Sequence, residues 1–138
     1  MSRAEQIAYA AGLIDGEGWI SVHDVSFRGR EAYQLRVAVM MTQRDGIGLL
    51  FDLFGGKFYY RPKTTVRKAQ DSWMLFGSRA DRALRELLPH MRVKQYLASI
   101  ALSADWTGFI GRPITEEQQA IRRQIAGMTK DLNRRGPR

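Results

Sequence analysis

Two acidic residues interrupt a run of small and apolar residues near the start of the chain. Residues 10–18 read Ala-Ala-Gly-Leu-Ile-Asp-Gly-Glu-Gly, which places Asp15 and Glu17 at the end of an expected helix. A helix seldom carries so many small residues unless another element packs very close to it. What the two carboxylates can do therefore depends on what approaches this helix.

The small residues of the helix predict a close partner. Ala8, Ala11 and Gly12 share one face, so that another backbone can approach it closely. The chain contains one such segment, and its natural partner is the same segment of a second copy across a two-fold axis. Two copies of Glu17 would then meet near the axis. Carboxylates that close repel unless a cation lies beside them, and a hard divalent ion such as Mg²⁺ suits oxygen ligands.

Composition narrows the classes of function. The 138 residues fit one compact domain, and 44% hydrophobic residues are enough to form a core. The 22 Lys and Arg residues exceed the 14 Asp and Glu residues by eight, which favours a polyanionic partner, either nucleic acid or an anionic membrane. Because the chain has no cysteine, disulfides, thiolate zinc sites and cysteine nucleophiles are excluded. With His23 and His90 as its two histidines, any metal site is expected to use oxygen ligands.

The chain carries no sign of a membrane span or a signal peptide. No apolar run approaches the roughly 18–20 residues that cross a bilayer, and the start, Met-Ser-Arg-Ala-Glu-Gln, lacks an apolar stretch. We expect no membrane partner. We expect a cytoplasmic protein, or an organellar one if the gene lies in an organelle genome.

Hydrophobic periodicity predicts an α-β-β-α-β-β-α-α order followed by a basic terminal helix. Asp45, Ser78 and Thr115 are expected helix caps, the last two with Asp81 and Gln118 at the capping-box position. The expected helices cover residues 4–16, 45–54, 78–89 and 93–106 and a segment after 115, and the expected strands cover 19–27, 33–42, 57–63 and 72–76. Glycines and a proline at 108–113 break the chain before the last helix.

Two successive β-β-α units favour an α+β fold, in which helices cover one face of a four-stranded antiparallel sheet. Alternation then predicts the residues of the other face, which are Ser21, His23, Gln34, Arg36, Lys57, Tyr59 and Arg61. Such a polar and basic face could read the major groove of DNA, or it could simply be solvated.

The nine residues 10–18 resemble the signature motif of the LAGLIDADG homing endonucleases. Ala10 is unusual at the first motif position, whereas Gly16 and Glu17 are common variants of its last two. The element order also matches the fold of that family, αββαββα, from about residue 5 to residue 107. One motif in a short chain resembles the homodimeric branch, in which each subunit reads one half of a pseudo-palindromic site.

The resemblance implies roles for individual residues. Glu17 would ligate the catalytic Mg²⁺ with the carbonyl of Gly16, and Mn²⁺ or Ca²⁺ could substitute for binding. Asp15 would be mainly structural and would lie in the dimer interface with Ala8, Ala11 and Gly12. Gln43 would position the nucleophilic water, and Lys94 would lie beside the scissile phosphate. An arginine that some members carry is Ile47 here, so that Arg44 or a basic residue of another loop would have to replace it.

DNA contacts are expected over the open sheet face and two basic loops. Gln34, Arg36 and Arg61 suit adenine and guanine edges, followed by Ser21, His23, Lys57 and Tyr59. Asp71 and Trp73 are the candidates from the fourth strand, although Trp73 suits the core equally well. Arg28 and Arg30 of one turn, and Lys63, Arg67 and Lys68 of another loop, are expected to track phosphates. The basic tail, with Arg122, Arg123, Lys130, Arg134 and Arg135, either lies on flanking DNA or forms a solvated helix.

The resemblance therefore implies a metal-dependent, site-specific double-strand DNA endonuclease that acts as a homodimer. Residues 1–110 would form the endonuclease domain, and 111–138 a basic helical extension. One alternative keeps the fold without cleavage, as a DNA-binding regulator or an intron maturase. Another is a basic ribosome-associated protein, which would explain the charge but not the glycine-acid motif.

Overall fold

The computed structural model describes residues 1–107 and 113–134 and has the predicted order of elements. The breaker at 108–113 falls almost wholly outside the described residues, and so does Arg135. The elements are α1 (Arg3–Glu17), β1 (Gly18–Asp24), β2 (Tyr33–Met41), α2 (Arg44–Phe54), β3 (Lys57–Arg61), β4 (Gln70–Phe76), α3 (Gly77–Leu87), the 3-10 turn η1 (Leu88–His90), α4 (Gln95–Ala101) and α5 (Glu116–Arg134).

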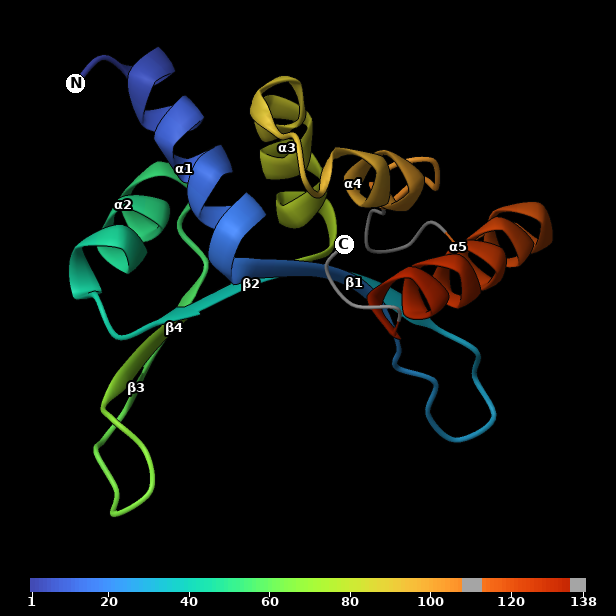
Figure 1. Cartoon of the computed structure of the whole chain (residues 1–138). Helices are drawn as coiled ribbons and strands as arrows, with labels where there is room; N and C mark the ends of the chain where they lie inside the picture. Colours follow the sequence, from blue (N-terminus) through green and yellow to red (C-terminus); the bar gives the residue numbers. More distant parts are fainter. Residues whose placement is uncertain (108–112, 135–138) are drawn as a thin grey trace.

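One antiparallel sheet organises the molecule, with its strands in the order β1-β2-β4-β3. The helices α1, α2 and α3 lie on one side of it, and the other side is open (Figure 1). The loops that follow β1 and β3 both reach toward the open side, one at each end of the sheet, so that the sheet forms an arch. The α+β fold expected from the sequence is confirmed.

The strand register decides which side chains share a face. Ile20, Leu35 and Val37 are buried among the helices, so the residues that alternate with them point to the open side. Direct cross-strand partners share a face. Ser21 pairs with Arg36, which pairs with Phe76, and His23 pairs with Gln34. Lys57, Tyr59 and Arg61 pair with Met74, Ser72 and Gln70. All seven residues predicted for the open face lie on it.

The prediction for the fourth strand was wrong by one residue. Trp73 is 0% exposed and pairs with Val39 on the covered face, where its Nε1 donates to the carbonyl of Gly55 at 2.7 Å. Asp71 is 4% exposed on the same face and binds Arg44. Because side chains alternate along a strand, the open face of β4 instead carries Gln70, Ser72, Met74 and Phe76. Neither Asp71 nor Trp73 can line the open face.

Helix α1 packs with its aliphatic side into the core. Ser2 caps its start, since the Ser2 hydroxyl accepts from the Glu5 N–H and the Glu5 carboxylate accepts from the Ser2 N–H. Ile7, Ala10, Ala11 and Ile14 are buried by the chain's own core. Ala11, predicted to contact a second copy, is 0% exposed and cannot do so.

No helix in the described residues is long and apolar enough to cross a membrane.

Candidate nucleic-acid interface and catalytic centre

The carboxylate of Asp15 fixes the end of α1 to a segment far along the chain. Its two oxygens accept hydrogen bonds from the backbone N–H groups of Arg92, at 2.7 Å, and Lys94, at 3.0 Å. A carboxylate that accepts two backbone bonds orients the donating segment firmly. The structure thus gives Asp15 the positional task expected of the first motif acid, here between α1 and the segment before α4.

Lys94 completes this junction. Its Nζ donates to the carbonyl oxygen of Asp15 at 2.5 Å, where the last turn of α1 has no basic residue of its own. A cation near the unpaired carbonyls at a helix C-terminus is stabilising. Partial burial lowers the pKa of the Lys94 ammonium, and the negative charges of Asp15 and Glu17 oppose that shift. Lys94 therefore lies within electrostatic reach of Glu17.

Glu17 is the last residue of α1, directly before the first strand of the sheet. It is exposed, as is Gly16, and a Cβ added to Gly16 would meet no atom within 4 Å. A carboxylate and a backbone carbonyl suit a hard divalent cation that keeps several of its waters. Within residues 1–107 and 113–134 no three His, Asp or Glu side chains gather to hold a metal. The oxygen atoms at Gly16 and Glu17 fit one part of a divalent site.

Gln43 follows the strand that pairs with the start of β1. Because Val39 pairs with Gly18, the end of β2 runs alongside the end of α1. Gln43 is the exposed N-cap residue of α2, and its side-chain amide makes no capping hydrogen bond. The register thus brings Gln43 to the same end of the sheet as Glu17.

Arg44, next to Gln43, binds Asp71, which we expected from the sequence to contact DNA. Arg44 donates to Asp71 at 3.1 and 3.4 Å, and its guanidinium lies 5.4 Å from the ring centroid of Tyr60. The Arg44 side chain is still 66% exposed. Ile47, at the position where the resemblance led us to look for an arginine, is buried in the core.

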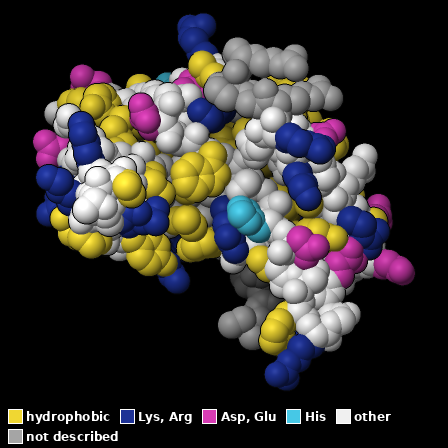
Figure 2. Space-filling view, turned by 60° about the horizontal axis from the view of Figure 1, so that its bottom comes forward, with side chains coloured by type: hydrophobic (Ala, Val, Ile, Leu, Met, Phe, Trp, Pro, Cys, Tyr) yellow, Lys and Arg dark blue, Asp and Glu magenta, His cyan; other side chains and the backbone are white. Residues whose placement is uncertain are grey.

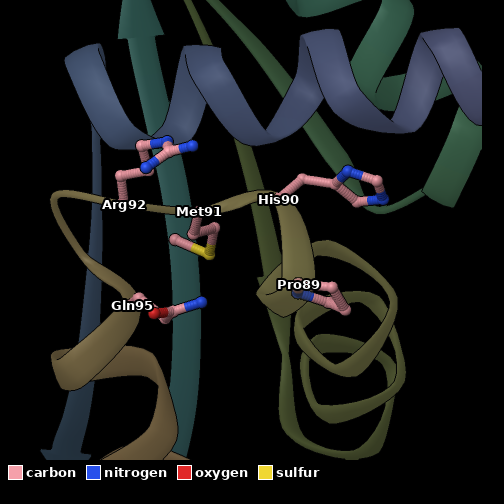
Figure 3. Close-up of a pocket in the computed structure, with 5 residues that line it drawn as sticks. All are labelled: Pro89, His90, Met91, Arg92 and Gln95. Carbon is pink, nitrogen blue, oxygen red and sulfur yellow. The ribbon is translucent and has the colours of Figure 1, made fainter.

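The segment that Asp15 holds also lines a cleft beside α1. Pro89, His90, Met91, Arg92 and Gln95 border about 390 Å³ of space (Figure 3). The side chain of Arg92 points toward α1, whereas Met91 is buried. The Asp15 junction therefore forms one wall of a polar recess at the edge of the helix.

Basic and aromatic side chains cluster at the middle of the open face. Arg36 donates to Gln34 at 2.8 Å, and its guanidinium lies 5.5 Å from the ring centroid of Phe76. Lys57 reaches the same ring at 5.6 Å. The sequence prediction did not place Phe76 on the open face, because it assigned Asp71 and Trp73 of β4 to that face. The residues that alternate with those two include Phe76. Figure 2, in which this side comes forward, shows basic side chains among apolar ones across the face.

His23 lies on this face beside Arg36. Loss of solvation lowers the pKa of its imidazole, and the positive charge of Arg36 lowers it further, which favours the neutral ring. A neutral imidazole can both donate and accept a hydrogen bond, which suits base edges better than a charged ring would.

Two hairpin loops extend the open face at its ends. Residues 25–32 end in a tight turn, where Phe27 and Arg30 exchange backbone hydrogen bonds of 3.0 Å and Arg28 and Gly29 have positive φ. In the other loop Thr64 donates to the Arg67 carbonyl, and Arg67 donates to the Pro62 carbonyl. Arg28, Arg30, Lys63 and Lys68 are exposed, and Arg67 is half-buried.

No family model and no curated protein sequence matches the chain. Solved structures do. I-CvuI, a homing endonuclease in complex with its target in the presence of Ca, has a TM-score of 0.64 and 16% identity, over 92% of this chain and 96% of that one. The archaeal intron-encoded homing endonuclease I-Vdi141I, complexed with DNA, has a TM-score of 0.67 and 14% identity, over 99% and 89% of the two chains.

A third structure carries the name of the motif. I-LtrWI, a LAGLIDADG homing endonuclease bound to target DNA, matches with a TM-score of 0.51 and 14% identity, over 72% of this chain and 37% of that one. This chain has the homing endonuclease fold. At these identities the likeness concerns the fold. Within that fold motif residues 10–17 form the end of α1, as the sequence predicts, and Gly18 begins β1.

Proposed function

We propose that this protein is a site-specific double-strand DNA endonuclease that acts as a homodimer with a divalent metal. The observation that supports it best is the placement of one exposed acid. Glu17 ends α1 where the open sheet begins, within electrostatic reach of Lys94, which hydrogen-bonds to the same helix end. An exposed carboxylate at the end of a basic surface, with a cation nearby, is a candidate ligand for a hard divalent ion.

The open face suits double-stranded DNA. Arg36, Lys57 and Arg61 offer positive charge, and Gln34, His23 and Ser21 offer hydrogen-bonding groups for base edges in the major groove. The basic residues of the two loops would bind phosphates and set the register without reading sequence. The net charge of +8 adds sequence-independent attraction.

Each residue of the centre then has a defined task. Glu17 and the carbonyl of Gly16 would hold Mg²⁺, with Mn²⁺ or Ca²⁺ able to replace it for binding. When bound, the ion would stabilise the attacking and leaving oxygens of phosphodiester hydrolysis. Lys94 would offset negative charge that develops on the phosphate oxygens, and Gln43 would orient the nucleophilic water. Asp15 would keep Lys94 in place through the two backbone bonds that it accepts.

The second subunit would meet the first along α1. Ala8, Gly12 and Gly16 recur every four residues and are exposed, and a Cβ at Gly12 would meet no atom within 4 Å. The space beside them lets a second helix come close, which would bring the two copies of Glu17 together.

The test is cleavage of a randomised duplex library. In the presence of Mg²⁺ the wild-type protein should cleave one long, pseudo-palindromic sequence and so deplete it from the uncut library. Glu17→Gln should bind that sequence without cutting it. Cleavage that survives Glu17→Gln would overturn the metal assignment. If both proteins bind one site and neither cuts, the protein is a DNA-binding regulator or maturase instead.

The alternative of a ribosome-associated protein leads to a different expected result. Such a protein would show neither a dimer in sedimentation nor a preference for any duplex sequence.

A further inference from the structure

The loop between β1 and β2 (residues 25–32) has its own internal hydrogen bonds and extends beyond the paired part of the sheet. The β1–β2 pairing stops at Asp24 and Tyr33. Beyond that point the Val25 N–H donates to the Ala32 carbonyl at 2.8 Å, and the Ala32 N–H donates to the Ser26 hydroxyl at 3.0 Å. These bonds shape the hairpin and its basic tip. Both bonds lie within the loop itself and join it to no other part of the protein.

Helix α5 binds this loop at Glu31. Arg123 donates to both carboxylate oxygens of Glu31, at 2.5 and 2.6 Å, in a bidentate pair. The side-chain amide of Gln119 donates to the backbone carbonyl of Glu31. The Tyr33 hydroxyl, at the start of β2, donates to the same carboxylate at 2.6 Å. One loop residue is therefore held through its side chain and its backbone.

Helix α5 is itself fastened to the body of the protein. At its far end Asn133 donates to the Ile20 carbonyl at 2.9 Å, on the outer side of the edge strand β1. Arg122 donates to the Asp105 carbonyl at 2.6 and 3.0 Å and lies over the ring of Trp106. Thr129 is fully buried. Figure 1 shows α5 running beside β1, with the loop below it.

We propose that α5 is a positioning element of the DNA interface, and that the Glu31–Arg123 pair sets the angle at which the Arg28–Arg30 tip meets the DNA backbone. This inference rests on the proposed function. A hairpin held in its bound orientation loses less conformational freedom on binding, and affinity rises accordingly. The pair also neutralises a carboxylate that would otherwise stand beside the phosphates and repel them.

The contacts speak against the simpler idea that α5 is only a basic arm on flanking DNA. The guanidinium groups of two arginines of α5 already have partners within the protein, since Arg123 binds Glu31 and Arg122 binds the Asp105 carbonyl. A helix that served only as a basic arm would not need its arginines bound to other parts of the chain. Lys130, which is exposed on the same helix, offers a control that removes one positive charge without touching Glu31.

The first experiment measures amide hydrogen exchange in the DNA-free protein. Arg123→Ala should speed exchange at Val25 and Ala32, because the loop then loses its ion pair with α5 and, of its bonds to that helix, keeps only the one from Gln119 to the Glu31 carbonyl. The charge-swapped double variant Glu31→Arg/Arg123→Glu should restore protection, and Lys130→Ala should not change it. Unchanged exchange in Arg123→Ala, or failure of the swap to restore protection, would overturn the bracing role. Because no DNA is present, this result does not depend on the proposed function.

The second experiment measures binding and turnover on the duplex that the library selection yields. Arg123→Ala should weaken binding by about threefold to tenfold, as expected when a binding loop loses pre-organisation. Cleavage at saturating DNA should be unchanged, because the centre near Glu17 is not touched. An equal loss in Lys130→Ala would mean that α5 acts through charge alone, and lower turnover at saturation would mean general damage. Either result would overturn the proposal, whereas a wild-type protein that binds no duplex would overturn the proposed function.

Discussion

The carboxylates of Asp15 and Glu17 stand two residues apart but face different surroundings. Asp15 is half-buried and accepts two backbone hydrogen bonds, from Arg92 and Lys94, whereas Glu17 is exposed. Asp15→Ala should lower the free energy of unfolding by about 1–3 kcal/mol, because it leaves two amides without their acceptor. Glu17→Gln should leave it within about 0.5 kcal/mol of wild type, as is usual at exposed sites. Urea unfolding of both variants measures the difference.

The two variants should also separate in activity. Glu17→Gln should abolish cleavage while it retains the fold. Asp15→Ala should reduce cleavage through the displaced segment that carries Lys94. Equal destabilisation by the two substitutions would contradict this division between the acids.

Glu31 should make stability depend on acid pH. Its hydrogen bonds with Arg123 and then Tyr33 lower its pKa from 4.5 to about 2. Because the folded protein holds the proton less tightly than the unfolded chain, the pair stabilises the fold fully above about pH 4.5. That stabilisation is lost as the pH falls from there to about 2. The melting temperature of wild type should therefore exceed that of Glu31→Gln above pH 4.5, and the gap should close toward pH 2.

A double variant checks the source of that gap. In an Arg123→Ala background, Glu31→Gln should change the pH dependence far less. If the gap between wild type and Glu31→Gln keeps its size down to pH 2, the ion pair does not stabilise the fold.

At the residue scale, the resemblance to the motif assigned different tasks to the acids at 15 and 17 and placed Lys94 at the same centre. It did not reveal which groups bind Asp15. The partners of Asp15 come from residues 92 and 94, which only the folded chain brings to the end of α1. The error at Asp71 and Trp73 has another cause, because a strand with apolar residues in both phases does not reveal which phase is buried.

At the scale of elements, the hairpin tip depends on a glycine. Gly29 has a φ of 76°, a region that costs an L-residue about 1–2 kcal/mol. Gly29→Ala should therefore destabilise the protein by about 1 kcal/mol and loosen the tip. Gly127→Ala is the matched control, because Gly127 lies in α5 with open space around it. The same substitution there should stabilise by about 0.5–1 kcal/mol through helix propensity. Equal signs in thermal unfolding would contradict the turn geometry.

Element types were easier to predict than element ends. The Thr115–Gln118 capping box is confirmed, with two reciprocal bonds of 3.1 Å. Asp45 and Ser78 do not cap their helices, which begin after Gln43 and Phe76 without side-chain caps, and Asp81 binds Arg85 instead. The helix predicted over 93–106 is α4, which spans only Gln95–Ala101. Its start is set by the bonds of the preceding segment to Asp15, which a local pattern cannot reveal.

At the scale of the whole molecule, one chain offers half of the proposed centre. The β-β-α repeat made the four-stranded sheet and its open face predictable, since both follow from periodicity and connection order. The face by which α1 would meet a second copy was predicted only in part. Ala8 and Gly12 are exposed, but Ala11 packs into its own core, because the short helix must also cover the sheet.

Gly12→Leu should convert the protein to a monomer without unfolding it. No atom lies within 4 Å of a Cβ built on Gly12, so that leucine there meets solvent in a single chain but fills the contact in a dimer. Gly127→Leu is the control, since it adds the same side chain on an open face of α5. Sedimentation velocity should give a monomer for Gly12→Leu and a dimer for Gly127→Leu. At a protein concentration low enough for the wild-type dimer to dissociate, the melting temperatures of both variants should be no lower than that of wild type. Cleavage should be lost with the dimer, because the second Glu17 is then missing from the centre. A Gly12→Leu protein that stays dimeric and cuts would place the subunit contact elsewhere than on α1.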